Sequence, residues 1–154
     1  MGSVVVETFI RAPREIVFDL ARDVEAHRQS SSFSQERVVP PGRLTGKLEA
    51  GDRVTFEGKH FGIRQRATAK ITQMKRPEVF EDMLVESAFT WLRHVHEFIE
   101  RDGGTLMIDR LEWRAPLGFL GRIADRLFVE RHMRWFVATK QNALKTLAEQ
   151  AQRI

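Results

Sequence analysis

The chain has 154 residues, 42% of them hydrophobic, and contains no cysteine. This length predicts one globular domain over residues 1–154. The lack of cysteine excludes disulfides, thiolate metal sites and a cysteine nucleophile. Lys and Arg (25) exceed Asp and Glu (21) by four, an excess too small to indicate a nucleic-acid partner. No apolar run is long enough to span a bilayer, so we expect a soluble, cytoplasmic protein without integral membrane contact.

The first third of the chain is predicted to hold one strand and two short helices. β-branched residues alternate over residues 3–11, which is typical of a strand. Helical spacing of apolar residues after a proline predicts a helix over 14–21, and a shorter helix is expected over 23–28. Residues 29–42 are rich in Ser, Pro and Gly, so this segment is predicted to be an irregular, mobile flap.

The middle of the chain is predicted to be an antiparallel meander, with strands at 52–60, 63–74, 79–86, 89–100 and 105–114. In the strand at 63–74, side chains alternate between two faces, one predicted to point inward and the other outward. The inward set is Ile63, Gln65, Ala67, Ala69 and Ile71, and the outward set is Arg64, Arg66, Thr68, Lys70 and Thr72. The chain then ends in a helix from about 118 to 151, with a bend near residue 130 where its apolar stripe rotates.

A tight turn at 101–104 aligns ionisable residues across the sheet. Its Asp-Gly pair supplies the positive φ angles of a hairpin. If Glu100 faces Thr105, His96 faces Asp109, about 5 Å away on the same face. The turn after the preceding strand sets Asp82 opposite His94.

A face that carries two histidines and two carboxylates admits two interpretations. His96, Asp109, His94 and Asp82 are candidate acid/base groups, because a histidine beside a carboxylate in a partly dry cavity exchanges protons near neutral pH. The same groups also suit a hydrogen-bonded network that fixes the sheet or orients a ligand. The spacing matches no known metal motif, so neither a metal nor a cofactor is predicted.

Other polar residues are assigned to structural positions. His27, four residues after Asp23, is predicted to form a surface pair within its helix. His60 lies beside Gly62 at a tight strand connection, where it either caps turn carbonyls or lies at one end of a cavity. The sequence lacks a serine nucleophile elbow and a phosphate-binding glycine loop, which argues against hydrolase, kinase and dinucleotide-enzyme functions.

The predicted order of elements is one strand, two short helices, a meander and a long helix. This order indicates an α+β fold with a curved sheet around the terminal helix. Small inward residues on such a sheet predict a pocket against the helix. The order resembles the START/Bet v 1-like superfamily, also called the polyketide cyclase/dehydrase and lipid-transport (SRPBCC) superfamily. Within it, a bacterial subgroup labelled cell-division-inhibitor-like is similar at Val54-Thr55-Phe56, Arg76-Pro77-Glu78, His94-Val95-His96-Glu97-Phe98, Met107-Ile108-Asp109-Arg110 and Ala115-Pro116-Leu117-Gly118.

This resemblance implies the helix-grip fold and a cavity for a lipid, polyketide or other aromatic or apolar ligand, but no particular reaction. We therefore expect a binding protein for a small hydrophobic molecule. The alternatives are a cyclase/dehydrase- or aromatase-like enzyme that uses the four acid/base candidates, and a protein-interaction module built on the last helix. The oligomeric state stays open. The residues predicted to line the ligand site are His60, Gln65, Ala67, Phe80, Leu84, His94, His96, Phe98, Met107, Asp109, Leu111, Trp113, Met133 and Phe136.

Overall fold

The computed structural model describes residues 1–154 except 61, 88, 90, 115–122, 124–127 and 153–154, and describes residue 60 by its backbone alone. Its elements are β1 (Gly2–Ile10), α1 (Arg14–Ala21), α2 (Val24–Ser30), the 3₁₀ helix η1 (Ser32–Ser34), β2 (Arg37–Val39), β3 (Arg53–His60), β4 (Ile63–Lys75), β5 (Val79–Glu86), β6 (Trp91–Arg101), β7 (Gly104–Arg114) and α4 (Glu130–Ala151). The expected strands agree with these bounds to within two residues.

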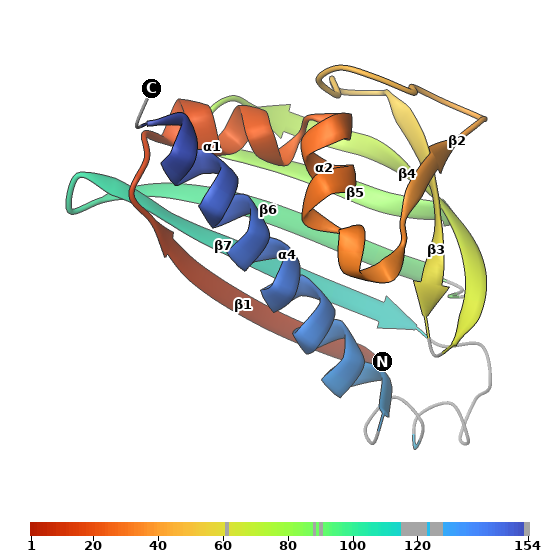
Figure 1. Ribbon diagram of the computed structural model, residues 1–154. Coiled ribbons are helices and arrows are strands. Elements are labelled where there is room, and N and C mark those ends of the chain that lie inside the picture. Colours follow the sequence, from red (N-terminus) through yellow and green to blue (C-terminus); the bar gives the residue numbers. More distant parts are fainter. Residues whose placement is uncertain (61, 88, 90, 115–122, 124–127, 153–154) are drawn as a thin grey trace.

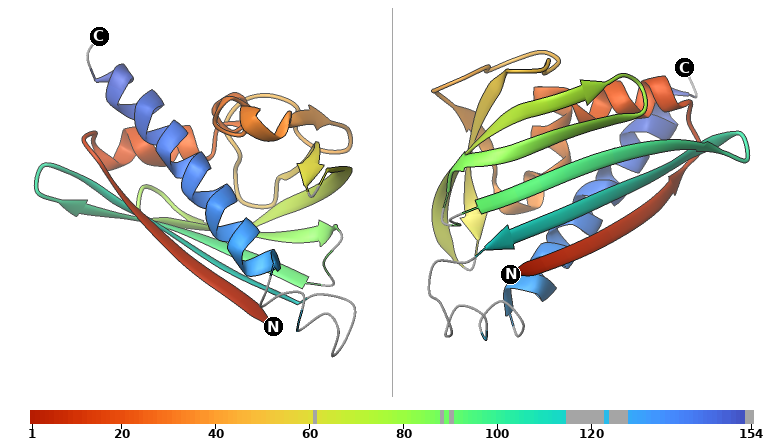
Figure 2. Two further views of the ribbon diagram at one scale, coloured as in Figure 1. Left: turned by 60° about the horizontal axis from the view of Figure 1, so that its bottom comes forward. Right: turned by 180° about the vertical axis from the view of Figure 1, so that it is seen from behind.

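The strands form a seven-stranded antiparallel sheet in the order β1-β7-β6-β5-β4-β3-β2. The sheet curves around α4, which crosses its concave face diagonally (Figure 1). Both views of Figure 2 place α1 and α2 on the same side of the sheet as α4. This arrangement confirms the predicted α+β helix-grip fold. Among the described helices, none has the length and apolarity needed to cross a membrane.

The β6–β7 hairpin has the predicted register. Asp102 and Gly103 adopt positive φ angles of 49° and 77°, as a tight turn requires. Glu100 then pairs with Thr105 and His96 with Asp109, while the β5–β6 ladder pairs Asp82 with His94. The turn chemistry therefore fixes which residues of β6 and β7 face each other under α4.

The hydrophobic core lies between the concave face and the helices. Phe18 of α1 meets the rings of Phe80 and Phe98 edge-on, at centroid distances of 5.3 and 5.2 Å, an arrangement that aromatic pairs favour. Leu144 and Ala148 of α4 belong to the same core cluster. A second buried cluster, formed by Val4, Leu92, Leu111, Trp113 and Val137, lies toward the other end of β6 and β7.

Three details differ from the sequence-based expectation. The segment predicted to be irregular contains the short edge strand β2, which pairs with β3. Ile63, assigned to the inward face, is 64% exposed, because it lies beside the β3–β4 turn at the end of its strand. Thr68, assigned outward, is 2% exposed because Thr55 covers it, with 2.8 Å between their hydroxyl oxygens. The last helix was predicted to start at residue 118. That start, and the part of its apolar stripe before residue 128, lie mostly outside the described residues.

Candidate functional site

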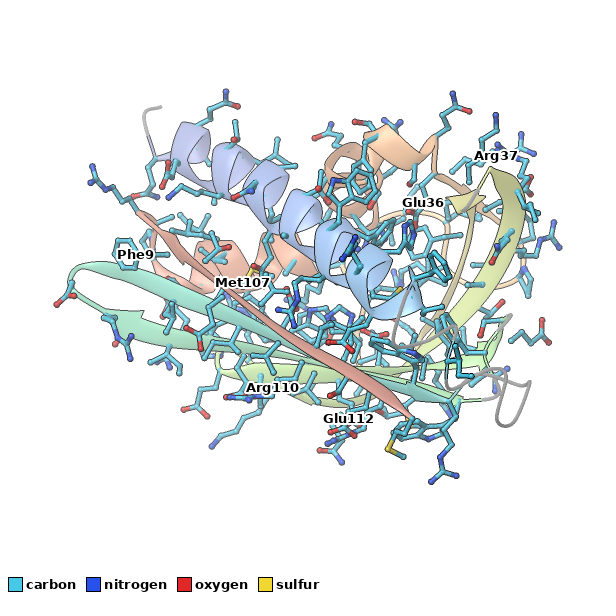
Figure 3. All side chains as sticks on the ribbon, turned by 90° about the horizontal axis from the view of Figure 1, so that it is seen from below. Phe9, Glu36, Arg37, Met107, Arg110 and Glu112 are labelled. Carbon is cyan, nitrogen blue, oxygen red and sulfur yellow. The ribbon has the colours of Figure 1, made fainter. Side chains whose placement is uncertain are left out.

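A pocket of about 410 Å³ lies between the concave face of the sheet and α4. Most of its wall is apolar, formed by side chains that include Leu20, Phe56, Leu84, Leu92, Leu111, Met133, Phe136, Val137 and Leu144. Polar side chains also reach it from the sheet, from the helices and from the segment before β2: His27, Glu36, Asp82, His94, His96, Asp109, Lys140 and Gln141. Figure 3 shows Met107 between sheet and helix, with Arg110 and Glu112 of the same strand on the opposite face.

Asp109 of β7 is the central polar residue of the pocket. It is 2% exposed, so its carboxylate requires partners inside the protein. His94 Nε2 lies 2.9 Å from its Oδ1, and Gln141 of α4 donates from Nε2 to its Oδ2 at 2.6 Å. Gln141 is itself held by Val6 and Thr8 of β1. The carboxylate therefore joins β1, β6, β7 and α4 in one network.

His96 lies between two carboxylates. Its Nε2 is 2.8 Å from Asp82 Oδ2, and its Nδ1 is 2.7 Å from Asp109 Oδ1. The second contact has ion-pair distance without hydrogen-bond alignment. Burial alone would lower the pKa of His96, but the charges of Asp109 and Asp82, together with the hydrogen bond to Asp82, raise it to about 9. His96 is therefore an imidazolium ion at neutral pH, with an N–H group toward each carboxylate.

The neighbouring groups respond to this fixed positive charge. Burial, reinforced by the charge of His96, lowers the pKa of His94, so His94 is neutral and donates to Asp109 from Nε2. Burial would raise the pKa values of Asp82 and Asp109, but the two histidines lower both. At neutral pH the sheet cluster of Asp82, His94, His96 and Asp109 contains two carboxylates, one imidazolium and one neutral imidazole.

The side-chain hydrogen bonds run diagonally across the strands. His96 pairs with Asp109 in the backbone ladder but hydrogen-bonds to Asp82, and His94 pairs with Asp82 but hydrogen-bonds to Asp109. Diagonal neighbours remain within reach of long side chains, and sheet twist brings one diagonal closer. Backbone register thus brings the four residues together, whereas twist and side-chain reach select the pairs.

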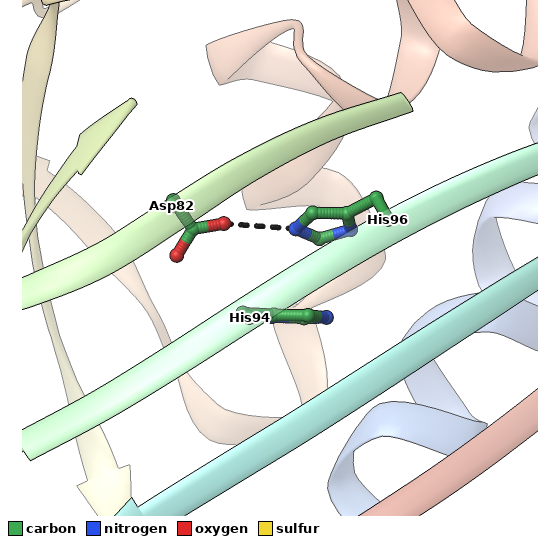
Figure 4. Close-up of side chains that lie close together, drawn as sticks. All are labelled: Asp82, His94 and His96. Atoms are coloured by element: carbon green, nitrogen blue, oxygen red, sulfur yellow. Dashed lines mark hydrogen bonds and ion pairs between the residues drawn. The ribbon is translucent and has the colours of Figure 1, made fainter. Parts of the chain in front are cut away.

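The same cluster has some features of a metal centre. One ligand atom from each of Asp82, His94 and His96 lies within 4.8 Å of the others, and Figure 4 shows them converging from β5 and β6. However, the two imidazole rings are stacked, with centroids 3.7 Å apart and planes inclined by 26°. Because nitrogen lone pairs lie in the ring planes, stacked rings do not direct them at one point. This geometry suits hydrogen bonding better than coordination.

A second polar group, which we call the helix cluster, consists of Glu36, His27 and Lys140. His27 Nε2 lies 3.1 Å from Glu36 Oε1, and Lys140 Nζ lies 3.1 Å from each ring nitrogen of His27. The imidazole stacks on Phe56 at a centroid distance of 4.0 Å. The expected surface pair of His27 with Asp23 is wrong, because Asp23 instead accepts from the Ala26 N–H at the start of α2.

The structure brings most of the predicted site residues to one pocket. All four acid/base candidates line it, as do Gln65, Ala67, Leu84, Met107, Leu111, Met133 and Phe136. Phe80 and Phe98 lie instead in the core against Phe18, and Trp113 is fully buried beside Gly2. The side chain of His60 lies outside the described part of the chain.

Sequence reasoning missed Gln141 and the helix cluster. A signal for Gln141 existed, since Val137, Gln141, Leu144 and Ala148 share one helical face and are the buried residues of α4. A glutamine within an apolar stripe indicates a buried hydrogen-bond partner. Lys140 and Glu36 had no comparable signal, because their partners are distant in the sequence.

The charge state of His96 is open to direct measurement. Its pKa is higher in the folded than in the unfolded chain, so its stabilising effect is complete below about pH 6.5 and is lost as the pH rises through about 9. We expect NMR titration of the ring Cε1–H to show His96 protonated at pH 8, with His94 neutral. Asp109→Asn should lower the His96 pKa, because it removes one of the two carboxylate charges.

Glu97→Gln is the matched control for this titration. Glu97 lies on the same strand as His96 but on the outward face, where it accepts from Arg110 Nε at 2.8 Å. Its neutralisation should leave the His96 titration unchanged. A His96 that titrates below pH 7 in the unmodified protein would contradict the imidazolium assignment.

Neither a scan of the sequence against protein-family models nor a comparison with curated proteins gives a match. Solved structures do match. The protein TTHA0849 from Thermus thermophilus is 20% identical, with a TM-score of 0.79 over 97% of this chain and 98% of that one. A Mycobacterium smegmatis protein is 17% identical, with a TM-score of 0.70 over 94% and 89% of the two chains.

A plant protein shares the architecture as well. The major latex-like protein 151 from Panax ginseng is 11% identical, with a TM-score of 0.69 over 96% of this chain and 97% of that chain. Identities at this level establish a common fold rather than a common activity, and the bacterial subgroup stays a prediction. The chain therefore has the helix-grip fold that these solved structures share.

Proposed function

We propose that the protein binds a small, largely hydrophobic molecule, of the lipid, polyketide or aromatic class, in the pocket between the sheet and α4. The observation that carries the proposal is the pocket itself, which has about 410 Å³ of space and a mostly apolar wall with polar groups at a few positions. Ligand sites typically have this composition, in which apolar surface supplies affinity and a few polar groups set orientation. In this proposal the polar end of the ligand faces Asp82, His94 and Lys140.

The protonation states favour binding over acid/base catalysis. An imidazolium with a pKa of about 9 retains its proton at neutral pH, and a neutral histidine whose pKa is lowered is a poor proton acceptor there. General acid/base catalysis works best when the pKa lies near the working pH. The sheet cluster consequently offers a ligand fixed charges and hydrogen-bonding groups.

A cavity-filling substitution tests ligand binding. Ala67 of β4 lines the pocket, so Ala67→Phe should occupy part of its volume and weaken binding of the neutral fluorescent probe N-phenyl-1-naphthylamine by about tenfold or more. The measurement is a fluorescence titration, with a thermal melt to establish that the variant folds.

Ala151→Phe is the matched control for this titration. Ala151 lies at the exposed end of α4, and the same added ring there should leave the affinity for the probe unchanged. A folded Ala67→Phe variant that binds the probe as tightly as the unmodified protein would show that the probe binds elsewhere.

The second candidate function is a cyclase/dehydrase- or aromatase-like enzyme. It is favoured by the contact of all four acid/base candidates with one pocket, since perturbed ionisable groups in a cleft mark active sites more often than chance. The binding proposal predicts that a poly-β-ketone thioester is not consumed, as followed by ultraviolet absorbance and mass spectrometry. Consumption that His96→Gln abolishes, with probe affinity retained, would instead establish the enzyme.

A further inference from the structure

Four exposed cations lie together on β2, β3 and β4, close to the β3–β4 turn. They are Arg37, Lys59, Arg64 and Arg66, which we call the basic cluster. The strand ladder places Glu57 between Arg37 and Arg66, and Lys59 opposite Arg64. Three of the cations pair with the one carboxylate of Glu57, Arg37 at 2.9 Å, Arg64 at 2.7 Å and Arg66 at 3.7 Å. One negative charge does not balance four positive charges, so the basic cluster attracts anions.

The same end of the molecule exposes apolar side chains. The β3–β4 turn, the β5–β6 connection and the start of α4 lie together there in Figure 1 and in the right-hand view of Figure 2. Ile63 beside the first of these is 64% exposed, Val85 before the second is 46% exposed, and Phe128 before α4 is 65% exposed. Apolar groups that gather on a surface mark an interaction site. We call this end, with residues 62–66, 85–87 and 128–131, the turn end.

The pocket extends to the turn end. Gly58 and Arg66 line it from β3 and β4, Phe89 lines it from the β5–β6 connection, and Val129 and Met133 line it from the start of α4. Arg66 thus belongs both to the pocket lining and to the basic cluster. Exposed apolar side chains, excess positive charge and the pocket wall therefore adjoin one another.

We infer that the turn end docks on an anionic membrane surface, with Ile63 and Phe128 among the lipid headgroups and the basic cluster against the lipid phosphates. Apolar side chains beside Lys and Arg are the combination that binds membrane interfaces. A soluble polyanion would use the cations alone and leave Ile63, Val85 and Phe128 in water. A membrane surface accounts for both the charged and the apolar part of the turn end.

Docking and ligand binding are separate properties of the protein. Docking needs only the surface of the turn end, so the inference goes beyond the proposed function. Exchange of an apolar ligand between the bilayer and the pocket, which docking permits, rests on the proposed function as well.

Vesicle co-sedimentation tests the charge requirement. We expect the protein to bind vesicles of phosphatidylcholine and phosphatidylglycerol in equal parts about tenfold more tightly than vesicles of phosphatidylcholine alone, with a difference that declines as salt is added. Lys59→Gln combined with Arg64→Gln should weaken binding to the anionic vesicles about tenfold, because two cations near the lipid phosphates are lost.

Arg101→Gln combined with Arg110→Gln is the matched control for this charge loss. Both arginines are exposed, Arg101 at the β6–β7 turn and Arg110 in the ladder of β7, and both lie outside the turn end. The control should bind the anionic vesicles as the unmodified protein does. Equal binding to both kinds of vesicle, or equal weakening by both double variants, would overturn the inference.

Ile63→Ser tests the contribution of the apolar side chains. It should weaken binding to the anionic vesicles about tenfold, because serine lacks the apolar surface that leaves water on docking. Ile99→Ser is the matched control, since Ile99 is 38% exposed beside the opposite, β6–β7 turn, and it should leave binding unchanged. Full competition by heparin, together with unchanged vesicle binding by Ile63→Ser, would indicate a soluble polyanion as the partner and would overturn the inference.

Hydrogen exchange of the unmodified protein locates the contact without any substitution. Anionic vesicles should slow exchange in residues 62–66 and 128–131 and leave the β6–β7 turn at 101–104 unaffected. Titration with N-phenyl-1-naphthylamine in the absence of vesicles measures the pocket separately. Probe binding without vesicle binding would overturn the docking and leave the proposed function intact, whereas vesicle binding without probe binding would support the docking and count against the proposed function.

Discussion

The protein is organised around one buried carboxylate. Asp109 lies almost wholly out of solvent, and an unpaired charge in such a place costs several kcal/mol. Its compensation comes from β6 through His94 and His96 and from α4 through Gln141. The sheet and its helix therefore have to meet in one register, because a slip of one residue would move Asp109 to the other face, which would remove the partner of His94 and leave His96 with Asp82 alone.

This constraint also explains why the centre of the fold holds a cavity. The aromatic core around Phe18 fills one end of the sheet, whereas polar groups that must keep their hydrogen bonds occupy the middle. Small residues such as Ala67 face the remaining space. The sheet cluster below and the helix cluster above then provide polar groups on opposite walls of an apolar chamber, which suits a molecule with an apolar body and a polar group.

Local chemistry in the sequence predicted the fold and half of the polar site. The Asp102-Gly103 turn sets the hairpin register, and two-residue alternation sets the faces of the strands, so His94, His96, Asp82 and Asp109 were found together. The helix cluster was not found, because its contact depends on how α4 rotates over α2 and on the path of the chain before β2. No periodicity within one segment encodes those angles. The placement of Phe80, Phe98 and Trp113 in the core depends likewise on which part of the concave face the helices cover.

We expect a small apolar molecule to occupy the pocket. Native mass spectrometry can detect it in protein that is purified gently from cells that express it, and denaturing extraction can then recover it. The expected result is a defined mass difference that disappears on denaturation, with recovery of a largely apolar compound that Ala67→Phe no longer retains. A protein that carries nothing, and that also fails to take up apolar compounds from a cell extract, would contradict it.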